Sequence, residues 1–426
     1  MKLSLRERDT NFIWHPYTQH KNMVPPIPIV RGKGSLLYDE SGNSYIDVIS
    51  SWWVTLHGHG HPFIAESIYR QALQLEQVIF TSFTHEPAVT LAENLLAVLP
   101  ANQSKIFYSD NGSTAVEVAL KMAIQYWKNR GEKQKTKILA FEHAYHGDTF
   151  GAMSVSGRGL FTQAFGDFLF ETVFIETPCA DNIDEIKSRI LEHRGRFAAF
   201  IYEPLLQAAG GMRMYEADSM NELLSFVRSE NILCIADEVL TGFGRTGSLF
   251  ASEKLRPGPD IVCMSKGLTG GAMALGCTSC SREIFEAFLS DDRRMTFFHG
   301  HSFTANPLAC AAALASLELL KNPSCQEQIR AIQQQHEQFL EEVRASERKN
   351  LFRNLRMLGT VLAFETAGEH PDYLQQIGSM IMKRAMEQGI YLRPLGNTVY
   401  LMPPYCITND ELRKVYDFIL DPAFAQ

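Results

Sequence analysis

An excess of positive charge is missing from this sequence. Lysine and arginine together number 40 against 48 aspartates and glutamates, so the net charge is -8, and no stretch gathers basic residues into a long run. Nucleic acids and anionic membranes attract proteins through such basic clusters. We therefore expect neither of them as the main partner of this chain.

A secretory signal and a long apolar run are also missing. The N-terminus, M-K-L-S-L-R-E-R-D-T, interrupts its few apolar residues with charge and so lacks the apolar core of a signal peptide. The longest nearly uncharged helical stretch, Phe303 to Leu317, is short for a bilayer span and contains Asn306 and Pro307. The sequence therefore predicts a soluble protein in which this stretch forms a buried helix.

Cysteine is sparse, with 8 residues in a chain of 426. Cys234, Cys263 and Cys310 lie inside apolar runs, which is typical of reduced core residues and not of a disulfide framework. Cys277 and Cys280 form one C-x-x-C motif without a second pair, so zinc is not expected, and thiol redox chemistry stays open as an alternative. A cytoplasmic location is the default expectation.

Between about residues 60 and 300, short apolar runs alternate with helical stretches. The four clearest runs are 138–141, 198–202, 232–236 and 261–264. Such alternation predicts an α/β fold with a mostly parallel central sheet and helices on its faces. The chain also exceeds the length at which a single core stops growing, so we expect a second, smaller domain.

The two ends of the chain differ from this middle region. We expect an N-terminal segment at 1–58, a large domain at 59–310 and a C-terminal domain at 311–426. The N-terminal segment has a hairpin signal with its bend at Ser41–Asn43. Beyond Pro323 come a polar helix, an apolar run at 361–364, another helix and a hairpin-like stretch at 389–403. This order predicts a smaller α+β domain.

Each apolar run of the middle region is followed by a residue able to do chemistry. Tyr145 follows the first run, Glu203 the second, Asp237 the third and Lys266 the fourth. In open α/β sheets, ligands bind beyond the carboxyl ends of the strands. We therefore expect an aromatic ring, two carboxylates and a lysine to meet in one crevice.

Lys266 follows a buried run and precedes glycines, and burial disfavours an ammonium group. A neutral lysine is a nucleophile that forms Schiff bases with carbonyl groups. Gly112 and Ser113 stand before a helical pattern, where free backbone amides form an anion site, although Ser113 could instead only cap the helix. With Tyr145 and Asp237, these features meet the requirements of pyridoxal phosphate, which needs a lysine and a carboxylate at its ring nitrogen.

Two other motifs suggest different chemistry. Gly242, Gly244 and Gly247 match the G-x-G-x-x-G pattern of dinucleotide-binding dehydrogenases, but no obvious helix follows them, so this remains a remote alternative. The alternating histidines of L-H-G-H-G-H-P, residues 57–61, could bind a divalent ion, but no acidic or cysteine ligand lies nearby in the sequence. We interpret them as a structural loop and expect no metal.

The strings A-D-E-V-L-T-G-F-G-R-T-G and D-I-V-C-M-S-K-G-L-T-G-G resemble the signature of the class III aminotransferases, which depend on pyridoxal 5'-phosphate. W-H-P-Y-T, S-S-W-W, Y-H-G-D-T-F-G-A-M-S and N-P-L-A-C-A-A-A extend the resemblance over nearly the whole chain. The resemblance implies fold type I, with a large domain that carries the cofactor on a mostly parallel sheet and a smaller α+β domain from both chain ends. It also implies a ping-pong transamination.

The resemblance further implies roles for individual residues. Lys266 would hold the cofactor covalently and then move a proton between substrate and cofactor, Asp237 would keep the ring nitrogen protonated, and Tyr145 would stack on the ring and border the substrate. The remaining cofactor contacts would be Gly112, Ser113, Glu203, His301 and Ser302. Ser302 falls where the family has a phosphate-binding threonine from the partner subunit, which would make a homodimer obligatory. His301 replaces the family's usual proline.

Substrate contacts would come from Tyr17, Trp52, Trp53, Gly300 and Arg393, in addition to Tyr145 and Lys266. A long aliphatic amino-keto acid needs an apolar wall, which the two tryptophans could form, and a cation for its distant carboxylate, which Arg393 suits. Core packing is the ordinary alternative for two adjacent tryptophans. A class III enzyme acting on another ω-amino acid, on ornithine or on 4-aminobutyrate would share the cofactor residues and stays open as an alternative.

Overall fold

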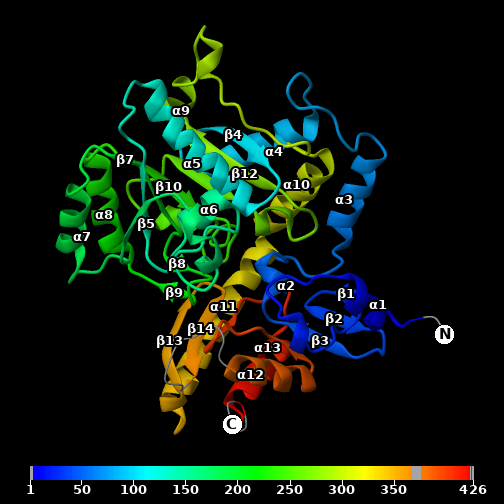
Figure 1. The fold of residues 1–426 in the computed structure, drawn as a ribbon. Coiled ribbons are helices and arrows are strands. Elements are labelled where there is room, and N and C mark those ends of the chain that lie inside the picture. Colours follow the sequence, from blue (N-terminus) through cyan, green and yellow to red (C-terminus); the bar gives the residue numbers. More distant parts are fainter. Residues whose placement is uncertain (1–2, 367–375, 423, 425–426) are drawn as a thin grey trace.

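The computed structural model describes residues 3–366, 376–422 and 424. Its largest sheet has seven strands in the order β4-β12-β11-β10-β7-β5-β6 (Figure 1). These are β4 Gln103–Ser109, β5 Lys137–Phe141, β6 Thr172–Ile175, β7 Phe197–Tyr202, β10 Leu233–Asp237, β11 Ile261–Met264 and β12 Gly276–Ser281. Only β12 in this sheet runs antiparallel to its neighbours. The expected mostly parallel sheet is confirmed.

Helices cover both faces of this sheet (Figure 1). They are α3 Pro62–Ala72, α4 Glu86–Leu96, α5 Gly112–Asn129, α6 Phe150–Ser154, α7 Ile183–Leu191, α8 Ala217–Ser229, α9 Arg282–Glu286 and α10 Pro307–Lys321. Side chains of β5 alternate between the two faces: Ile138 and Ala140 pack with the core of α5, whereas Leu139 and Phe141 pack with α7 and α8. Because both faces of the sheet are buried, the sequences of its central strands are continuous apolar runs.

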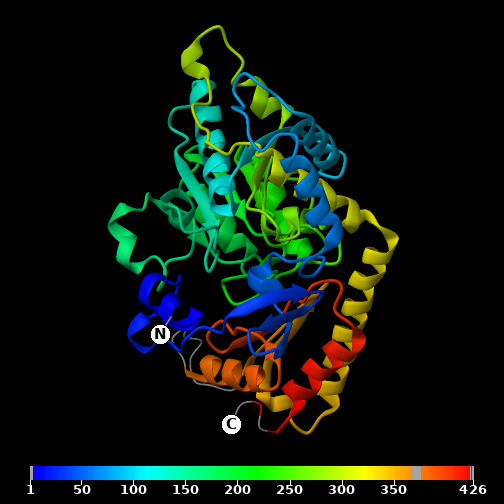
Figure 2. The same cartoon turned by 90° about the vertical axis from the view of Figure 1, so that its right-hand side faces the viewer.

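The opposite end of the molecule is built from both chain ends (Figures 1 and 2). One sheet joins β1 Ile29–Lys33, β2 Leu36–Asp39 and β3 Ser44–Asp47 to β15 Ile390–Tyr391, and another joins β13 Phe352–Leu358, β14 Val361–Thr366 and β16 Thr398–Leu401. The helices here are α1 Leu5–Phe12, α2 Ser50–Trp53, α11 Pro323–Ala345, α12 Gln376–Glu387 and α13 Asn409–Leu420. The long helix α11 leads from the large sheet into this smaller α+β unit.

Shorter elements complete the described chain. A two-stranded ribbon pairs β8 Leu206–Gln207 with β9 Arg213–Met214. The 3-10 turns are η1 His20–Asn22, η2 Gln163–Phe168, η3 Ala251–Lys254, η4 Lys266–Thr269, η5 Arg293–Met295 and η6 Lys349–Leu351.

One expected hairpin is present and another is not. The bend at Ser41–Asn43 joins β2 to β3, and the Asp39 carboxylate accepts hydrogen bonds from the amides of Ser41 (2.9 Å) and Asn43 (2.8 Å). In the hairpin-like stretch expected at 389–403, a tight turn joins Leu395 to Thr398 by an antiparallel bridge, but β15 and β16 do not pair with each other. Instead, β15 pairs in parallel with β3, and β16 pairs antiparallel with β14. Both strands find partners that are distant in the sequence.

The helix expected from Phe303 begins instead at Pro307, because Asn306 caps it through a hydrogen bond from the Ala309 amide (3.1 Å). It is buried, as expected, and packs against α3 and α4. Within the described residues, no helix combines the length and the apolar character needed to cross a bilayer. The boundary expected at 310/311 falls inside α10, and the three-part division of the chain stays a prediction.

The cysteines lie as core residues. Cys277 and Cys280 both belong to β12 but point into different cores, since Cys277 packs with the cluster around α10 and α11 and Cys280 packs with α5. The eight thiols are free and most are buried. Two sulfurs on opposite faces of one strand do not form a redox pair, so this alternative loses its support.

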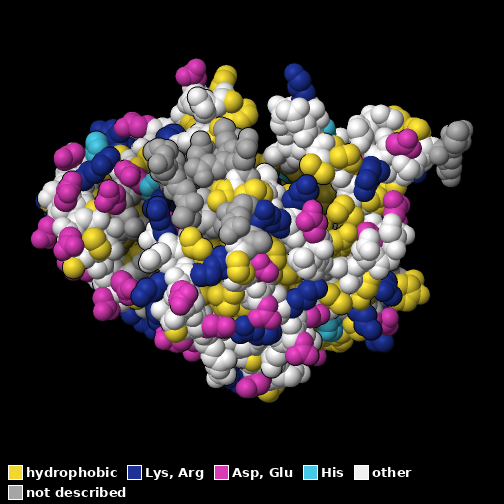
Figure 3. Space-filling view, turned by 90° about the horizontal axis from the view of Figure 1, so that it is seen from below, with side chains coloured by type: hydrophobic (Ala, Val, Ile, Leu, Met, Phe, Trp, Pro, Cys, Tyr) yellow, Lys and Arg dark blue, Asp and Glu magenta, His cyan; other side chains and the backbone are white. Residues whose placement is uncertain are grey.

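The charges on the surface are mixed. In the view from below, over the end that carries α11 to α13, acidic and basic side chains alternate without a broad region of one sign (Figure 3). Among the described side chains on this face, no basic patch of the kind that binds nucleic acid is seen.

Candidate active site

The ends of four parallel strands meet at one cavity of ≈ 430 Å³. Tyr145 lies in the loop after β5, Glu203 directly after β7, Asp237 at the end of β10 and Lys266 shortly after β11. All four line the cavity, together with Trp53 and the start of α5. The structure thus brings these side chains together, as the sequence predicted.

The start of α5 presents backbone amides to this cavity. Asn111, and not Ser113, caps the helix, because its side chain accepts a hydrogen bond from the Thr114 amide (3.0 Å). The interpretation of Ser113 as a mere cap is therefore wrong. Within the described chain, the amides of Gly112 and Ser113 have no hydrogen-bond partner, so they are available to an anion at the positive end of the helix dipole.

Glycines allow the neighbouring segments to approach this helix start. A Cβ on Gly112 would lie 2.7 Å from Cγ1 of Val239, and one on Gly147 would lie 2.1 Å from Oγ of Ser113. Ser113 Oγ also accepts a hydrogen bond from the Asp148 amide (3.3 Å). A residue larger than glycine at either position would therefore displace Val239 or Ser113 at the start of this helix.

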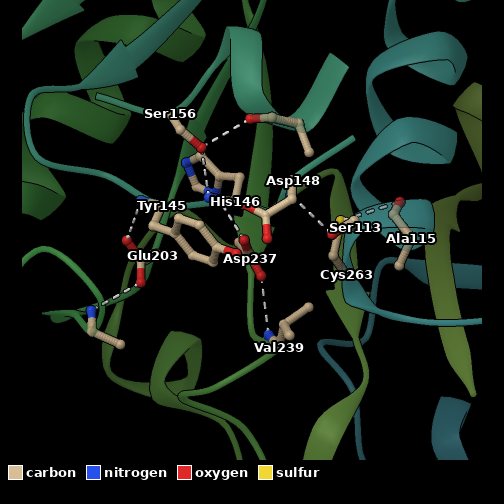
Figure 4. A network of polar contacts seen from close by, with 12 residues as sticks. Ser113, Ala115, Tyr145, His146, Asp148, Ser156, Glu203, Asp237, Val239 and Cys263 are labelled. Atoms are coloured by element: carbon tan, nitrogen blue, oxygen red, sulfur yellow. Dashed lines mark hydrogen bonds and ion pairs between the residues drawn. The ribbon is translucent and has the colours of Figure 1, made fainter. Parts of the chain in front are cut away.

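Asp237 is held by two donors inside the protein (Figure 4). Its Oδ2 lies 2.6 Å from Nδ1 of His146, and its Oδ1 accepts a hydrogen bond from the Val239 amide at 3.1 Å. The amide of His146 in turn donates to Ser156 Oγ (2.9 Å). Both side chains are buried, so the carboxylate has the cationic or polar partner that a buried charge requires. His146 was missed from the sequence, although it directly follows Tyr145.

Glu203 is fully enclosed and ties two loops together. Its carboxyl accepts hydrogen bonds from the amides of Tyr145 (3.1 Å) and Ala208 (2.9 Å), as Figure 4 shows. Burial raises the pKa of Glu203 to about 7, while the charge of His146 acts to lower it and that of Asp237 to raise it. Glu203 therefore positions the loop that carries Tyr145.

Lys266 starts the turn η4 in the left-handed region of the backbone, with φ at 44°. Its Nζ lies 5.0 Å from the centre of the Trp53 ring. Burial lowers the pKa of this amine, and the charges of Asp237 and Glu203 oppose that shift. Desolvation thus favours the neutral, nucleophilic form that a Schiff-base lysine needs.

A wall of aromatic groups continues from Tyr145 away from the strand ends. The hydroxyls of Tyr17 and Tyr145 lie 3.3 Å apart, and the Tyr17 hydroxyl donates to Asp148. The Tyr17 ring lies 5.6 Å from that of Trp52, over which the Arg393 guanidinium stacks at 4.6 Å. Burial is the main cause of a raised pKa at Tyr145, and its hydrogen bond with Tyr17 adds to it.

The two adjacent tryptophans point in different directions. Trp52 is 42% exposed, whereas Trp53 is 5% exposed and donates a hydrogen bond from Nε1 to the Tyr400 hydroxyl (2.9 Å). Positive φ angles at Ser51 (61°) and Trp53 (67°) produce this division. Trp53 therefore both packs in the core and lines the cavity, and Trp52 alone faces the outer wall.

The expected residues at 300–302 do not line the cavity of their own chain. Gly300 and Ser302 are exposed, and the Ser302 carbonyl accepts a hydrogen bond from the Gln77 side chain (2.6 Å). His301 Nδ1 lies 3.6 Å from Oδ2 of Asp110, which does line the cavity. Only His301 of these three is therefore connected to the site within one chain.

The glycine motif at 242–247 and the histidines at 57–61 have structural roles. Gly244 lies in a packed turn, where an added Cβ would come within 3.0 Å of the Tyr405 hydroxyl. His57 contacts Ser316 Oγ (3.1 Å) and His59 contacts Asp47 (2.9 Å), so these rings serve separate partners. In the part of the chain that the structure describes, no group of three potential metal ligands converges. The glycines and histidines of these motifs thus take part in the packing of the fold.

A protein-family model for the class III aminotransferases matches residues 17–421. This chain therefore belongs to the class III aminotransferase family, with the α/β architecture of fold type I and pyridoxal 5'-phosphate as its cofactor.

Several individual proteins of this family are similar to the chain over nearly its full length. A relative from Synechococcus elongatus named adenosylmethionine-8-amino-7-oxononanoate aminotransferase is 46% identical over 419 residues, covering 96% of this chain and 97% of the relative. A protein of the same name from Geobacter sulfurreducens is 38% identical, with 98% and 96% covered. The crystal structure of the enzyme so named from Methanocaldococcus jannaschii has 35% identity and a TM-score of 0.92, with 97% of each chain covered.

Aminotransferases of other kinds share the fold. An ω-transaminase from Pseudomonas jessenii, solved in complex with PMP, has 27% identity and a TM-score of 0.91, covering 97% of this chain and 96% of its own. An amine transaminase from an uncultivated Pseudomonas species, solved in its PLP-bound form, has 30% identity and a TM-score of 0.89, covering 95% and 97%. The fold alone therefore does not select the substrate.

The cavity fits pyridoxal phosphate. The open amides of Gly112 and Ser113 suit a phosphate, the carboxylate of Asp237 suits a protonated ring nitrogen, and the buried amine of Lys266 suits a carbonyl carbon. The cradle that Gly112 and Gly147 keep free of side chains lies at the phosphate end of this set.

Proposed function

We propose that this chain transfers an amino group from S-adenosylmethionine to 8-amino-7-oxononanoate and so makes 7,8-diaminononanoate for biotin biosynthesis. The observation that carries the substrate assignment is the common name of relatives that match over nearly their full length, at 46%, 38% and 35% identity. The cofactor site alone would fit any class III enzyme.

When bound, pyridoxal phosphate supplies an electron sink for the bond that breaks at the substrate carbon. We assign Lys266 as the residue that holds the cofactor and, once released, carries a proton at Nζ. Asp237 keeps the ring nitrogen protonated, and the contact with His146 and the Val239 amide fixes its orientation. Burial lowers the pKa of Lys266, which favours the neutral form that can accept this proton.

The remaining cofactor contacts orient the ring. The amides of Gly112 and Ser113 hold the phosphate, and Tyr145 packs against the ring. Glu203 holds the Tyr145 loop in place through its two backbone hydrogen bonds.

We assign substrate recognition to the outer wall. Trp52 and Tyr17 provide apolar surface for an aliphatic chain, Arg393 provides a cation for its far carboxylate, and Trp53 closes the wall beside Lys266. Gly300 does not line the cavity of its own chain, so it would contact a substrate only from the partner subunit of a dimer.

We further propose a homodimer with shared active sites, in which Ser302 contributes to the phosphate site of the partner subunit. Four large apolar side chains, Ile79, Phe83, Phe298 and Phe303, are between 61% and 73% exposed. Their two segments lie side by side, because Gln77 contacts the Ser302 carbonyl and Asn306 contacts the Glu76 carbonyl. Exposed apolar surface of this kind marks interfaces. The cytoplasmic location stays a prediction.

The test is a half-reaction. The yellow enzyme is mixed separately with S-adenosylmethionine and with lysine, and the yellow absorbance is followed. We expect S-adenosylmethionine to bleach it and 8-amino-7-oxononanoate to restore it. If lysine bleaches the enzyme and S-adenosylmethionine does not, lysine is the amino donor. If ornithine or 4-aminobutyrate bleaches it and 8-amino-7-oxononanoate does not restore the colour, the substrate assignment is wrong.

A further inference from the structure

Four titratable side chains, of which only His301 belongs to the expected cofactor contacts, form a continuous line toward the cavity. Nζ of Lys121, on the outer face of α5, lies 2.9 Å from Nδ1 of His299. Nε2 of His299 lies 3.1 Å from Nε2 of His301. Nδ1 of His301 then lies 3.6 Å from Oδ2 of Asp110, which lines the cavity. We call these four residues the Lys121–Asp110 line.

The donors in this line can be assigned from its first member. A lysine ammonium only donates, so Nδ1 of His299 must accept and the proton of this neutral ring must sit on Nε2. His299 then donates to Nε2 of His301, which places the proton of His301 on Nδ1, the atom that faces Asp110. Burial chiefly lowers the pKa of His299, and the charge of Lys121 lowers it further, which agrees with a neutral ring.

Asp110 stands where a negative charge is unfavourable for the cofactor. It precedes Asn111 at the start of α5, two residues before the free amide of Gly112, and its carboxylate is only partly exposed. An uncompensated carboxylate at this place would repel the phosphate that those amides are suited to bind. The last donor of the Lys121–Asp110 line, Nδ1 of His301, faces this carboxylate at 3.6 Å and so opposes the repulsion.

We propose that the Lys121–Asp110 line fixes the tautomer of His301 so that its Nδ1–H faces Asp110, and that this N–H dipole weakens the repulsion between Asp110 and the phosphate group of the cofactor. The inference rests on the proposed function only through the cofactor and not through the substrates. It assigns a purpose to His301, whose backbone is held separately by a hydrogen bond from its amide to Thr304 Oγ1 (3.0 Å).

The experiment compares two ligands that differ only in the phosphate. Cofactor-free protein is titrated with pyridoxal 5'-phosphate and with pyridoxal, and both dissociation constants are read from tryptophan fluorescence. We expect His301→Gln to weaken pyridoxal phosphate about tenfold, equivalent to about 1.4 kcal/mol, and to change pyridoxal by less than about twofold. Lys121→Met should act in the same direction by about threefold, because its contact is exposed.

Asp110→Asn provides the matched control. It removes the charge that His301 opposes, so adding His301→Gln to Asp110→Asn should have less than about a twofold effect on pyridoxal phosphate. Sedimentation of each variant checks that its assembly is unchanged. If His301→Gln fails to fold, His299→Gln replaces it, because this change breaks the line one contact earlier.

Each outcome decides the matter. Selective weakening of pyridoxal phosphate that vanishes in the Asp110→Asn background supports the proposal. If His301→Gln leaves the ratio of the two dissociation constants unchanged, including the case in which both ligands bind equally more weakly, the proposal is wrong and His301 has only a packing role. Wild-type protein that fails to bind pyridoxal phosphate would overturn both this inference and the proposed function, whereas failure with S-adenosylmethionine alone would overturn only the latter.

Discussion

The strand ends around Lys266 and the segment 297–306 are held in opposite ways. Glu203, His146 and Asp237 are buried. Backbone amides of the same chain donate to Glu203 and Asp237, and the His146 ring is held by the Asp237 carboxylate. The segment 297–306 exposes Phe298 and Phe303 and makes mostly side-chain contacts. The chemistry is therefore preorganised by the large sheet, whereas the segment keeps surface for another molecule to cover.

Replacing Lys266 should produce the largest effect on the buried side of this comparison. Lys266→Ala removes the amine that holds the cofactor and carries the proton, so transamination should fall by about 10³-fold or more. The cofactor should still bind, non-covalently, and be lost on dialysis. Lys254→Ala, which removes an exposed lysine, serves as the control. If Lys266→Ala turns over within about tenfold of the wild-type rate, Lys266 is not the catalytic lysine.

The two tryptophans allow a sharper test, since they are neighbours in the sequence with opposite exposure. Trp53→Ala should lower the free energy of unfolding by about 3–5 kcal/mol, because it empties a core position. Trp52→Ala should lower it by less than about 1 kcal/mol and instead raise KM for the amino-keto acid. Chemical denaturation and steady-state kinetics on both variants measure this. Equal destabilisation by the two would contradict the division between core and wall.

The pKa of Glu203 gives the buried site a dependence on pH. Burial raises this pKa to about 7, so the folded state holds the proton more tightly than the unfolded state. Its contribution to stability is full below the ordinary glutamate pKa and is lost as pH rises through 7. Relative to Glu203→Gln, wild type should therefore lose roughly 3 kcal/mol of unfolding free energy between about pH 5 and pH 8.

Thermal or denaturant unfolding across this pH range checks the prediction. Glu40→Gln, at the exposed hairpin bend, is the control and should show no such trend. A difference between wild type and Glu203→Gln that stays constant from about pH 5 to pH 8 would mean that Glu203 remains ionised in the folded state.

The smallest effect on folding is expected in the segment 297–306. Phe303→Ser removes an apolar side chain that is 61% exposed, so the free energy of unfolding of one subunit should change by less than about 0.5 kcal/mol. If a second copy covers this surface, the same change should shift sedimentation toward monomer. If Phe303→Ser strongly destabilises the subunit and leaves the assembly unchanged, Phe303 is part of the subunit core and the proposed interface at 297–306 is wrong.

Much of the site could be predicted from the sequence because parallel strands end at a common edge. Tyr145, Glu203, Asp237 and Lys266 follow apolar runs, so their meeting needed only the topology of the sheet. The partnership of His146 with Asp237 was not predictable in this way. Their contact depends on how the loop after β5 folds back over β10, and nothing near His146 in the sequence specifies that.

The errors have a similar cause. Ser113 looked like a helix cap, yet Asn111 two residues earlier does this, since several residues of the segment could cap. The hairpin expected at 389–403 failed because Ile390 pairs with Ile46, and Val399 with Phe364. Local pattern identifies a strand, but its partner is set by packing between distant parts of the chain.

The pairing of β15 with β3 has a consequence for the order in which the site is completed during synthesis on the ribosome. Tyr17 and Trp52 emerge early, but Arg393 and the strand beside it emerge almost last. All strands of the large sheet, with the lysine and the phosphate cradle, are synthesised before β15. A chain truncated before β15 would therefore hold the cofactor residues without the completed wall that selects a substrate.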